Sequence, residues 1–455
     1  MENGENIKEE KGQAAAPAPA NICPQPDGAK PAETKRKLFD WKAILIFLSL
    51  VGPGLITANV DNDAGGIATF SIVGSNFGYS MLWALIPITI SLIIVQEMCA
   101  RMGVVTGKGL SDLIREEFGI KTTFFIMIGL ILANLTTTIA EFAGIAAAAE
   151  IFGISKYIVI PICIALIIFI IIKFDYKKVE KVFMFMVLFY VAYIISGFMA
   201  KPDWAEVGKE VIRPSIHFSS YYLAVLIALI GTNITPWMQF YLQASMVEKG
   251  IKVSEYKYAK WDVILGCIVT DVVSFFVILA VATTIFKAGH GGVESAADAA
   301  RALMPLAGKY AGYLFAFGLF NAALFGACIL PLSTSYYVCE SFGWEAGINK
   351  KFREAKVFYG IIIFTLLISG ALILIPNVPL LSIMLTSQVI NGMLLPFILI
   401  FILKLVNNKK LMGKHVNSKA YNIIAWITVA VLIGLTVLMV ISTIFPNFFA
   451  SIGLN

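Results

Sequence analysis

The chain has 455 residues, of which 58% are hydrophobic and 14% are charged. Soluble domains carry about 25% charged residues, so this composition excludes an ordinary soluble protein. Apolar stretches long enough to cross a bilayer as helices recur along nearly the whole length. No nucleophile–base set or cofactor motif is present, so we expect neither an enzyme nor a bound cofactor.

The hydropathy pattern predicts an all-α polytopic membrane protein with eleven transmembrane helices. The predicted spans are 44–73, 79–102, 122–148, 155–173, 178–199, 220–247, 261–286, 309–339, 356–375, 379–405 and 420–445. Residues 1–38 are polar and rich in Pro, Ala, Lys and Glu, which predicts a disordered cytoplasmic tail. The transmembrane domain is then expected over 39–447, followed by an extracellular end at 448–455.

Lysine and arginine are distributed unevenly between the two sides of this topology. With the N-terminus inside, 28 of the 35 fall on the inner side and 7 on the outer side. The positive-inside rule then predicts a cytoplasmic N-terminus and an extracellular C-terminus in the plasma membrane. This bias accounts for the net charge of +6, so the expected partner is the lipid bilayer rather than nucleic acid. The sequence does not specify the oligomeric state, and a monomer is favoured.

The first span is interrupted by polar residues. Its middle reads NVDNDAGGIATF, residues 59–70, with carboxylates at Asp61 and Asp63 and glycines at Gly65 and Gly66. A charge at mid-bilayer costs about 2.5 to 3.5 kcal/mol on insertion scales, and glycine weakens a helix. We therefore expect an unwound segment that carries carboxylate side chains.

The sixth span has a similar interruption. In ALIGTNITPWMQFYLQAS, residues 228–245, Pro236 removes a helix donor and predicts unwinding near 232–236. Paired interruptions five spans apart are typical of an inverted-repeat transporter. The repeats would occupy about 44–199 and 220–405, with an extra helix at about 420–445. A proline kink with incidental polar residues remains the alternative for the sixth span.

Other polar residues in the spans have both structural and functional interpretations. Glu141 shares a helix face with Thr138 and could bond to a neighbouring helix or assist the site. For Asp271 a structural hydrogen bond is favoured over a proton or ion way-station. Gln388 supplies a side-chain oxygen, although such a residue alone is more often a helix–helix contact. Glu97 and Arg101, at i and i+4, are expected to form an ion pair.

Five stretches of the chain carry a resemblance to a known family. They are DAGGIAT at 63–69, QEMCARMGVVTGKGL at 96–110, TIAEFAG at 138–144, GTNITPW at 231–237 and SQVINGMLLPF at 387–397. They are similar, in turn, to D-P-G-N-x-A-T, Q-x-x-x-A-R-x-G-x-V-T-G-K-x-L, D-x-A-E-x-x-G, G-A-T-x-M-P-H and S-Q-x-x-x-x-x-x-x-P-F. Together they resemble the NRAMP family of divalent-metal transporters, which implies a LeuT-like fold of five plus five helices and one extra helix.

The departures from the family pattern concern the metal ligands. The resemblance places the family's metal-site aspartate at Asp63, but the family's asparagine is replaced by Gly66 and its methionine by Thr235. This pattern resembles the NRAMP-related magnesium transporters. Independently of that resemblance, hydroxyl, carboxylate, carbonyl and water suit Mg²⁺, whereas thioether suits softer metals. The smaller side chains are expected to leave volume for waters that Mg²⁺ retains.

Two positions that the family uses for proton coupling are also replaced. The third-span aspartate is Thr138 and the sixth-span histidine is Trp237, while the glutamate is kept as Glu141. The three histidines of the chain all fall in loops: His217, His290 and His415. Neither replacement can carry a proton near neutral pH, so transport without proton coupling is expected.

These observations predict a secondary transporter or facilitator that imports Mg²⁺, and also Mn²⁺, by alternating access. Asp63 is the expected charged ligand, with the cavity lined directly or through water by Gly66, Thr232, Asn233, Thr235 and Gln388. Asp61 is expected to contribute less. One alternative is a proton-coupled Mn²⁺ or Fe²⁺ importer. An alternative from another class is an organic-cation or amino-acid permease of the same fold, in which Asp63 would bind an ammonium group.

Overall fold

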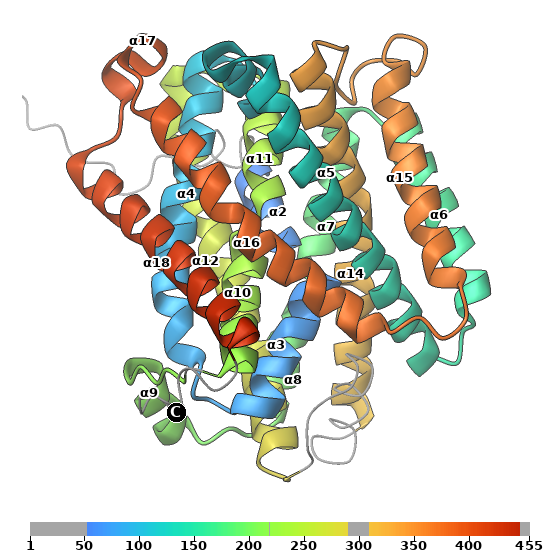
Figure 1. Ribbon diagram of the computed structural model, residues 1–455. Helices are drawn as coiled ribbons and strands as arrows, with labels where there is room; N and C mark the ends of the chain where they lie inside the picture. The colour runs from blue at the N-terminus through green and yellow to red at the C-terminus, as the bar shows by residue number, and fades with distance from the viewer. Residues whose placement is uncertain (1–51, 218, 290–308, 446–455) are drawn as a thin grey trace, which may run out of the picture. The chain divides into compact units, whose positions relative to one another are not determined.

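The structure, a computed structural model, describes residues 52–217, 219–289 and 309–445, and every regular element in these ranges is helical (Figure 1). All described residues belong to one compact unit, Leu45–Asn455. The helices are α2 (Pro53–Val60), α3 (Ala64–Phe77), α4 (Leu85–Thr106), α5 (Leu110–Ile151), α6 (Lys156–Lys173), α7 (Tyr176–Leu188), α8 (Val191–Met199), α9 (Trp204–Ile212), α10 (Ser220–Asn233), α11 (Pro236–Glu248), α12 (Tyr256–Val281), α14 (Lys309–Phe342), α15 (Lys356–Leu374), α16 (Leu380–Val406), α17 (Lys409–Met412) and α18 (Lys419–Ile444).

Ten helices or continuous helical runs in the described ranges are long and apolar enough to cross a membrane. They correspond to the predicted spans two to eleven. The predicted first span begins outside the described residues and continues as the two short helices α2 and α3, so the total of eleven remains a prediction. The tail at 1–38 and the end at 448–455 also lie outside the described residues.

Both predicted helix interruptions are present. The first span unwinds at residues 61–63 between α2 and α3, and the sixth unwinds at Ile234 and Thr235 between α10 and α11. Pro236 is the first residue of α11, a position where its missing N–H costs nothing because that donor would be unpaired in any helix. The proline therefore starts a new helix rather than kinking a continuous one.

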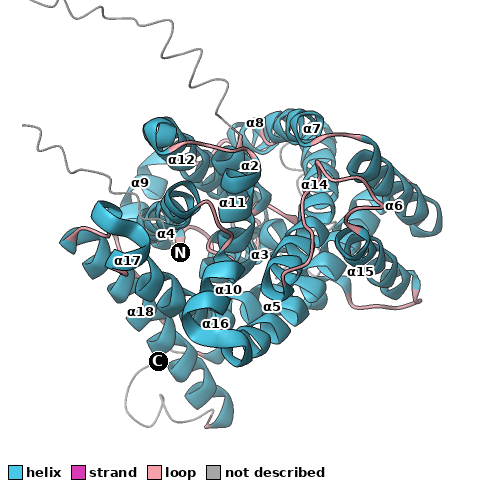
Figure 2. Ribbon diagram, turned by 90° about the horizontal axis from the view of Figure 1, so that it is seen from above, coloured by secondary structure: helices cyan, strands magenta, loops and turns pink. Residues whose placement is uncertain are grey.

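The interrupted helices lie in the interior of the bundle. In the most apolar window of Ser220–Glu248, 94% of the residues are buried, against 22% in that of Lys419–Ile441. In Figure 2, α2, α3, α10 and α11 are surrounded by other helices, whereas α6, α15 and α18 lie at the periphery. Unwound backbone at membrane depth is tolerated only inside protein or along a cavity, and both interruptions meet this condition.

Glycines allow the interrupted helices to approach their neighbours closely. A Cβ on Gly231 of α10 would lie 2.4 Å from the carbonyl oxygen of Gln388, and one on Gly392 of α16 would lie 2.6 Å from the carbonyl oxygen of Ile227. Similarly, a Cβ on Gly266 of α12 would lie 2.6 Å from the carbonyl oxygen of Gly54. Small residues at such crossings are the usual means of packing transmembrane helices.

The start of α2 is held by a carboxylate more than two hundred residues away. Asp262 of α12 accepts hydrogen bonds from the backbone N–H groups of Gly52, Gly54 and Leu55, at 3.2, 2.7 and 3.2 Å. These donors have no partner within the helix because they belong to its first turn. The expected ion pair between Glu97 and Arg101 is confirmed at 3.1 Å.

One span differs from its predicted form, and another is preceded by a helical segment that was not predicted. In α5, Gly119 adopts non-helical φ 79° and ψ 165°, which separates the segment that starts at Leu110 from the third span, so the span itself begins close to the predicted residue 122. The fifth is divided into α7 and α8 at Phe189 and Tyr190. Positive φ is accessible to glycine at little cost, but a glycine in an apolar sequence does not by itself specify a kink.

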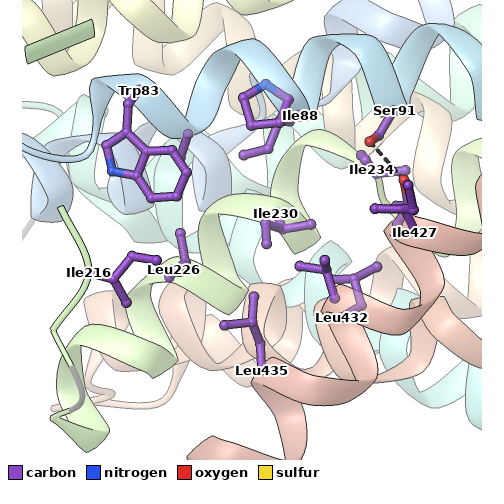
Figure 3. A pocket seen from close by; sticks show the side chains of 14 residues that line it. Trp83, Ile88, Ser91, Ile216, Leu226, Ile230, Ile234, Ile427, Leu432 and Leu435 are labelled. Atoms are coloured by element: carbon purple, nitrogen blue, oxygen red, sulfur yellow. Dashed lines mark hydrogen bonds between the residues drawn. The ribbon is translucent and has the colours of Figure 1, made fainter. Parts of the chain in front are cut away.

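A lateral groove lies between α4, α10 and α18 (Figure 3). Its lining is almost entirely apolar and includes Trp83, Leu226, Ile230 and Leu432. The hydroxyls of Ser91 and Thr428 hydrogen-bond to each other at 2.8 Å, so they are satisfied within the groove wall. Ile234, at the interruption between α10 and α11, also lines the groove.

Candidate ion-binding site

Asp63 begins α3 at the edge of the first interruption. Its side chain is 1% exposed and its Oδ1 accepts the backbone N–H of Gly66 at 2.5 Å, which makes it the N-cap of the half-helix. A carboxylate is stabilised there by the unpaired N–H groups and by the helix dipole. Its other oxygen, Oδ2, makes no hydrogen bond to the described residues.

Gln388 of α16 reaches Asp63, but through its nitrogen. Its Nε2 donates to Asp63 Oδ1 at 3.4 Å, and its Oε1 accepts from Asn391, whose Nδ2 also donates to Thr137 Oγ1. The sequence predicted a side-chain oxygen at this position. In the structure that oxygen is directed to Asn391, so direct ligation by Gln388 requires rotation of its amide.

Glu141 of α5 also lies at the start of α3. Its Oε2 accepts the backbone N–H of Ala64 at 3.1 Å, its carboxyl group faces Asp63, and its Oε1 makes no hydrogen bond to the described residues. A Cβ on Gly326 of α14 would lie 2.6 Å from Glu141 Cδ. Glu141 is thus hydrogen-bonded to a neighbouring helix, as its structural interpretation predicted, and its role in the site stays a prediction.

Asp61 connects the first interruption to the second. Its Oδ1 accepts from Thr235 Oγ1 at 2.9 Å, and its backbone carbonyl lies 3.4 Å from Thr232 Oγ1. Its Oδ2 makes no hydrogen bond to the described residues. The sequence assigned Thr232 and Thr235 to the ion site beside Asp63, whereas their hydroxyls contact Asp61.

The intervening residue, Asn62, is fixed by α12. Its Nδ2 donates to Thr270 Oγ1 at 2.7 Å and to the Thr270 carbonyl at 3.1 Å, and its Oδ1 accepts from Ser274 at 2.9 Å. Asn233 also faces α12, with its Oδ1 3.4 Å from Ser274 Oγ. Sequence inspection did not single out Thr270 or Ser274, because serine and threonine are common in transmembrane helices.

The volume expected at Gly66 is absent. A Cβ there would lie 2.4 Å from the carbonyl oxygen of Asp61, 2.9 Å from Thr232 Oγ1 and 3.3 Å from Asp63 Oδ1. The expectation that this glycine leaves room for water is wrong for this conformation. Gly66 instead permits the backbone of the unwound turn to approach α3.

The two positions that replace coupling residues are both buried. Thr138 donates to the carbonyl of Asn134 within α5 at 2.8 Å. The indole Nε1 of Trp237 makes no hydrogen bond to the described residues, and its carbonyl oxygen lies 3.3 Å from Ser333 Oγ. Neither side chain contacts Asp63 through a hydrogen bond in the described part of the chain.

Asp271 of α12 is 6% exposed and faces the side chain of Thr89 in α4. Thr89 is its hydrogen-bonding neighbour, although the two side chains lie outside strict hydrogen-bond geometry in the described residues. The favoured structural interpretation therefore stays a prediction.

The interior site combines ends of half-helices with buried oxygen atoms. The C-terminal ends of α2 and α10 meet there, and such ends present unpaired carbonyls with partial negative charge, which suit a cation. Within the described residues there is no group of three or more His, Cys, Asp or Glu side chains arranged to hold a metal. A metal ion bound at this site would therefore be held by carbonyl, hydroxyl and carboxylate oxygens together.

Paired interrupted helices that meet around buried carboxylates are typical of secondary transporters. The chain matches the family described as "Natural resistance-associated macrophage protein-like" (Nramp) over residues 54–442. It therefore belongs to the NRAMP family and is a transmembrane metal-ion transporter, not an enzyme.

Solved structures share its LeuT-like fold. The Eremococcus coleocola manganese transporter in complex with an aromatic bis-isothiourea substituted compound is 21% identical, with a TM-score of 0.70 over 89% of this chain and 88% of that one. MhsT in complex with L-phenylalanine is 11% identical, with a TM-score of 0.56 over 87% and 98% of the two chains. The nucleobase-cation-symport-1 family transporter MHP1 is 14% identical, with a TM-score of 0.54 over 88% and 94%.

Proposed function

We propose that this transporter imports Mg²⁺, and also Mn²⁺, by alternating access through the interior site, with Asp63 as its charged ligand. The observation that carries the proposal is Oδ2 of Asp63, which is buried between the ends of interrupted helices, meets hydrogen-bond geometry with none of the described residues and has the carboxyl group of Glu141 as its neighbour. An unpaired carboxylate at membrane depth is expensive, and a divalent cation is the partner that offsets this cost.

The preference for Mg²⁺ is supported by the chemistry of the side chains. A hydroxyl group at Thr235 stands where a thioether would favour softer metals, and Thr232 adds a second hydroxyl nearby. The buried side chains here offer oxygen atoms, and no cysteine or histidine in the described residues hydrogen-bonds to Asp63. Mg²⁺ keeps several waters when it binds proteins. Since the volume at Gly66 is filled, those waters need the more open conformations of the transport cycle.

The alternative metal is Mn²⁺ or Fe²⁺ with proton coupling. The similarity to the Eremococcus coleocola manganese transporter favours a metal of this kind. Against coupling, Thr138 and Trp237 cannot titrate near neutral pH, although Asp63 could itself exchange a proton for metal. A permease for organic cations or amino acids is the alternative of another class, and it shares only the fold with MhsT.

Uptake into liposomes distinguishes these functions. Protein reconstituted with a Mg²⁺-sensitive dye inside should show uptake of Mg²⁺ that Mn²⁺ inhibits. Uptake of Mn²⁺ without any uptake of Mg²⁺ would contradict the magnesium proposal, and failure to transport either ion would favour the permease.

A further inference from the structure

Asp61 lies where both helix interruptions meet. Thr232, at the end of α10, and Thr235, just before α11, both contact it, at 3.4 Å on its carbonyl oxygen and 2.9 Å on its Oδ1. The unwound turn of the first span is thereby attached to both sides of the second. An ion held between the interruptions would lie beside Asp61 as well as Asp63.

The charge of Asp61 has no compensating partner in the described residues. Its side chain is 1% exposed, its Oδ2 makes no hydrogen bond, and no lysine or arginine of the described chain pairs with it or with Asp63. A hydrogen bond from Thr235 satisfies only one of its oxygens. Burial of an unpaired carboxylate is unfavourable, so a residue used only to accept from Thr235 would be better replaced by asparagine.

Asp63, two residues along the chain, has the same arrangement. One of its oxygens is bonded, to Gly66 and Gln388, and the other meets hydrogen-bond geometry with none of the described residues, although the carboxyl group of Glu141 faces Asp63. Two carboxylates, each with one oxygen fixed by a neighbour and one unpartnered, match the charge of one divalent cation. Mg²⁺ is commonly bound through one or two carboxylates with its remaining positions filled by water.

We propose that Asp61 is a second carboxylate ligand of the transported ion, acting together with Asp63, and that Thr235 orients it. The proposal rests on the proposed function and deepens it. Thr235 holds Oδ1 and leaves Oδ2 for the ion, so the residue that replaces the family's methionine contributes through Asp61 rather than by direct ligation.

Metal binding to the purified full-length protein tests this assignment. Calorimetric titration of Asp61→Asn with Mg²⁺ and with Mn²⁺ should show affinity reduced by at least about tenfold, the lower end of the effect of removing a hydrogen bond from a metal ligand. Asp271→Asn is the matched control, because it removes a buried carboxylate that acts on Asp61 through its charge but hydrogen-bonds to neither interruption. It should lose less affinity than Asp61→Asn.

Melting temperatures separate ligation from a structural role. If Asp61 is a ligand, metal-free Asp61→Asn should melt at the same temperature as the wild type or higher, since an uncompensated charge has been removed. If metal-free Asp61→Asn melts at a lower temperature than the wild type, the metal affinity of Asp61→Glu is measured. Affinity restored in Asp61→Glu supports ligation by the carboxylate, and affinity as weak as in Asp61→Asn overturns the proposal. Wild-type affinity in Asp61→Asn, or an equal loss in Asp271→Asn, also overturns it. A wild type that binds neither ion overturns the proposed function, and this inference with it.

Discussion

The hydroxyl of Thr235 donates a 2.9 Å hydrogen bond to Oδ1 of Asp61, joining residues that are 174 positions apart. The bond joins the two interruptions of an inverted-repeat transporter directly to each other. Thr235 occupies the position at which the family carries a soft thioether, and its hydroxyl already donates a hydrogen bond to a hard carboxylate. This arrangement leads to a prediction about selectivity.

Thr235→Met should weaken Mg²⁺ transport relative to Mn²⁺ transport. The substitution removes the donor to Asp61 and introduces a thioether, which favours softer ions. Competition between the two ions in liposome uptake measures the ratio. Thr235→Val is the control, because it removes the hydroxyl without adding sulfur and should lower the transport of both ions. An unchanged ratio in Thr235→Met would contradict the hard-ion argument.

Gly66→Asn would restore the asparagine that the family carries at this position, but the structure disfavours this substitution as a test of selectivity. A Cβ at Gly66 would lie 2.4 Å from the carbonyl oxygen of Asp61. Loss of transport in that variant would reflect steric displacement of the unwound turn as readily as a change of ligand. Thr235→Met alone is the cleaner variant.

Close helix packing predicts a difference between two glycines. Gly231→Ala should destabilise the protein, since its Cβ would lie 2.4 Å from a backbone oxygen of α16, and overpacking of this kind costs about 1–3 kcal/mol. Gly434→Ala on α18 is the control, because nothing lies within 4 Å of its added Cβ. Thermal unfolding in detergent should show a lower melting temperature for the first and no decrease for the second. Equal melting temperatures would mean that the α10–α16 contact adjusts freely.

Several features of the fold were predictable because local chemistry determines them. Pro236 lacks a backbone N–H, and carboxylates beside a glycine pair disfavour a continuous helix at 59–70, so both interruptions were correctly predicted from short stretches of sequence. Long apolar runs likewise predicted spans two to eleven. The kink at Gly119 was not predicted, because a glycine can adopt positive φ at little cost but does not have to.

The detailed contacts of the site were less predictable because they depend on how distant segments meet. The bond from Thr235 to Asp61 requires knowledge of how the first interruption faces the second. The cap that Asp262 places on α2 spans 208 residues from Gly54. The expectation of free volume at Gly66 was wrong for a related reason. A glycine can leave an empty volume where a side chain would lie, or it can let neighbouring backbone fill that volume, and the packing of distant segments determines the outcome.

The coupling prediction follows from the absence of titratable groups at Thr138 and Trp237. Transport should be uniport, driven by the ion gradient and by the membrane potential, which contributes about 2.3 kcal/mol per elementary charge per 100 mV. A divalent ion carries two such charges. A pH-sensitive dye inside liposomes should report no change during Mg²⁺ uptake in the absence of an imposed proton gradient. Acidification that needs the metal and disappears in Asp63→Ala would show coupling through Asp63 itself.

The most direct test of the central claim is Mg²⁺ uptake into liposomes by Asp63→Ala compared with the wild type. The account predicts uptake by the wild type and none by the variant, because removal of Asp63 leaves the ion without its principal charged ligand. The variant should still insert and give the wild-type profile in size-exclusion chromatography, since cap loss costs only about 0.5–2 kcal/mol. Near-normal Mg²⁺ uptake by Asp63→Ala would contradict the account.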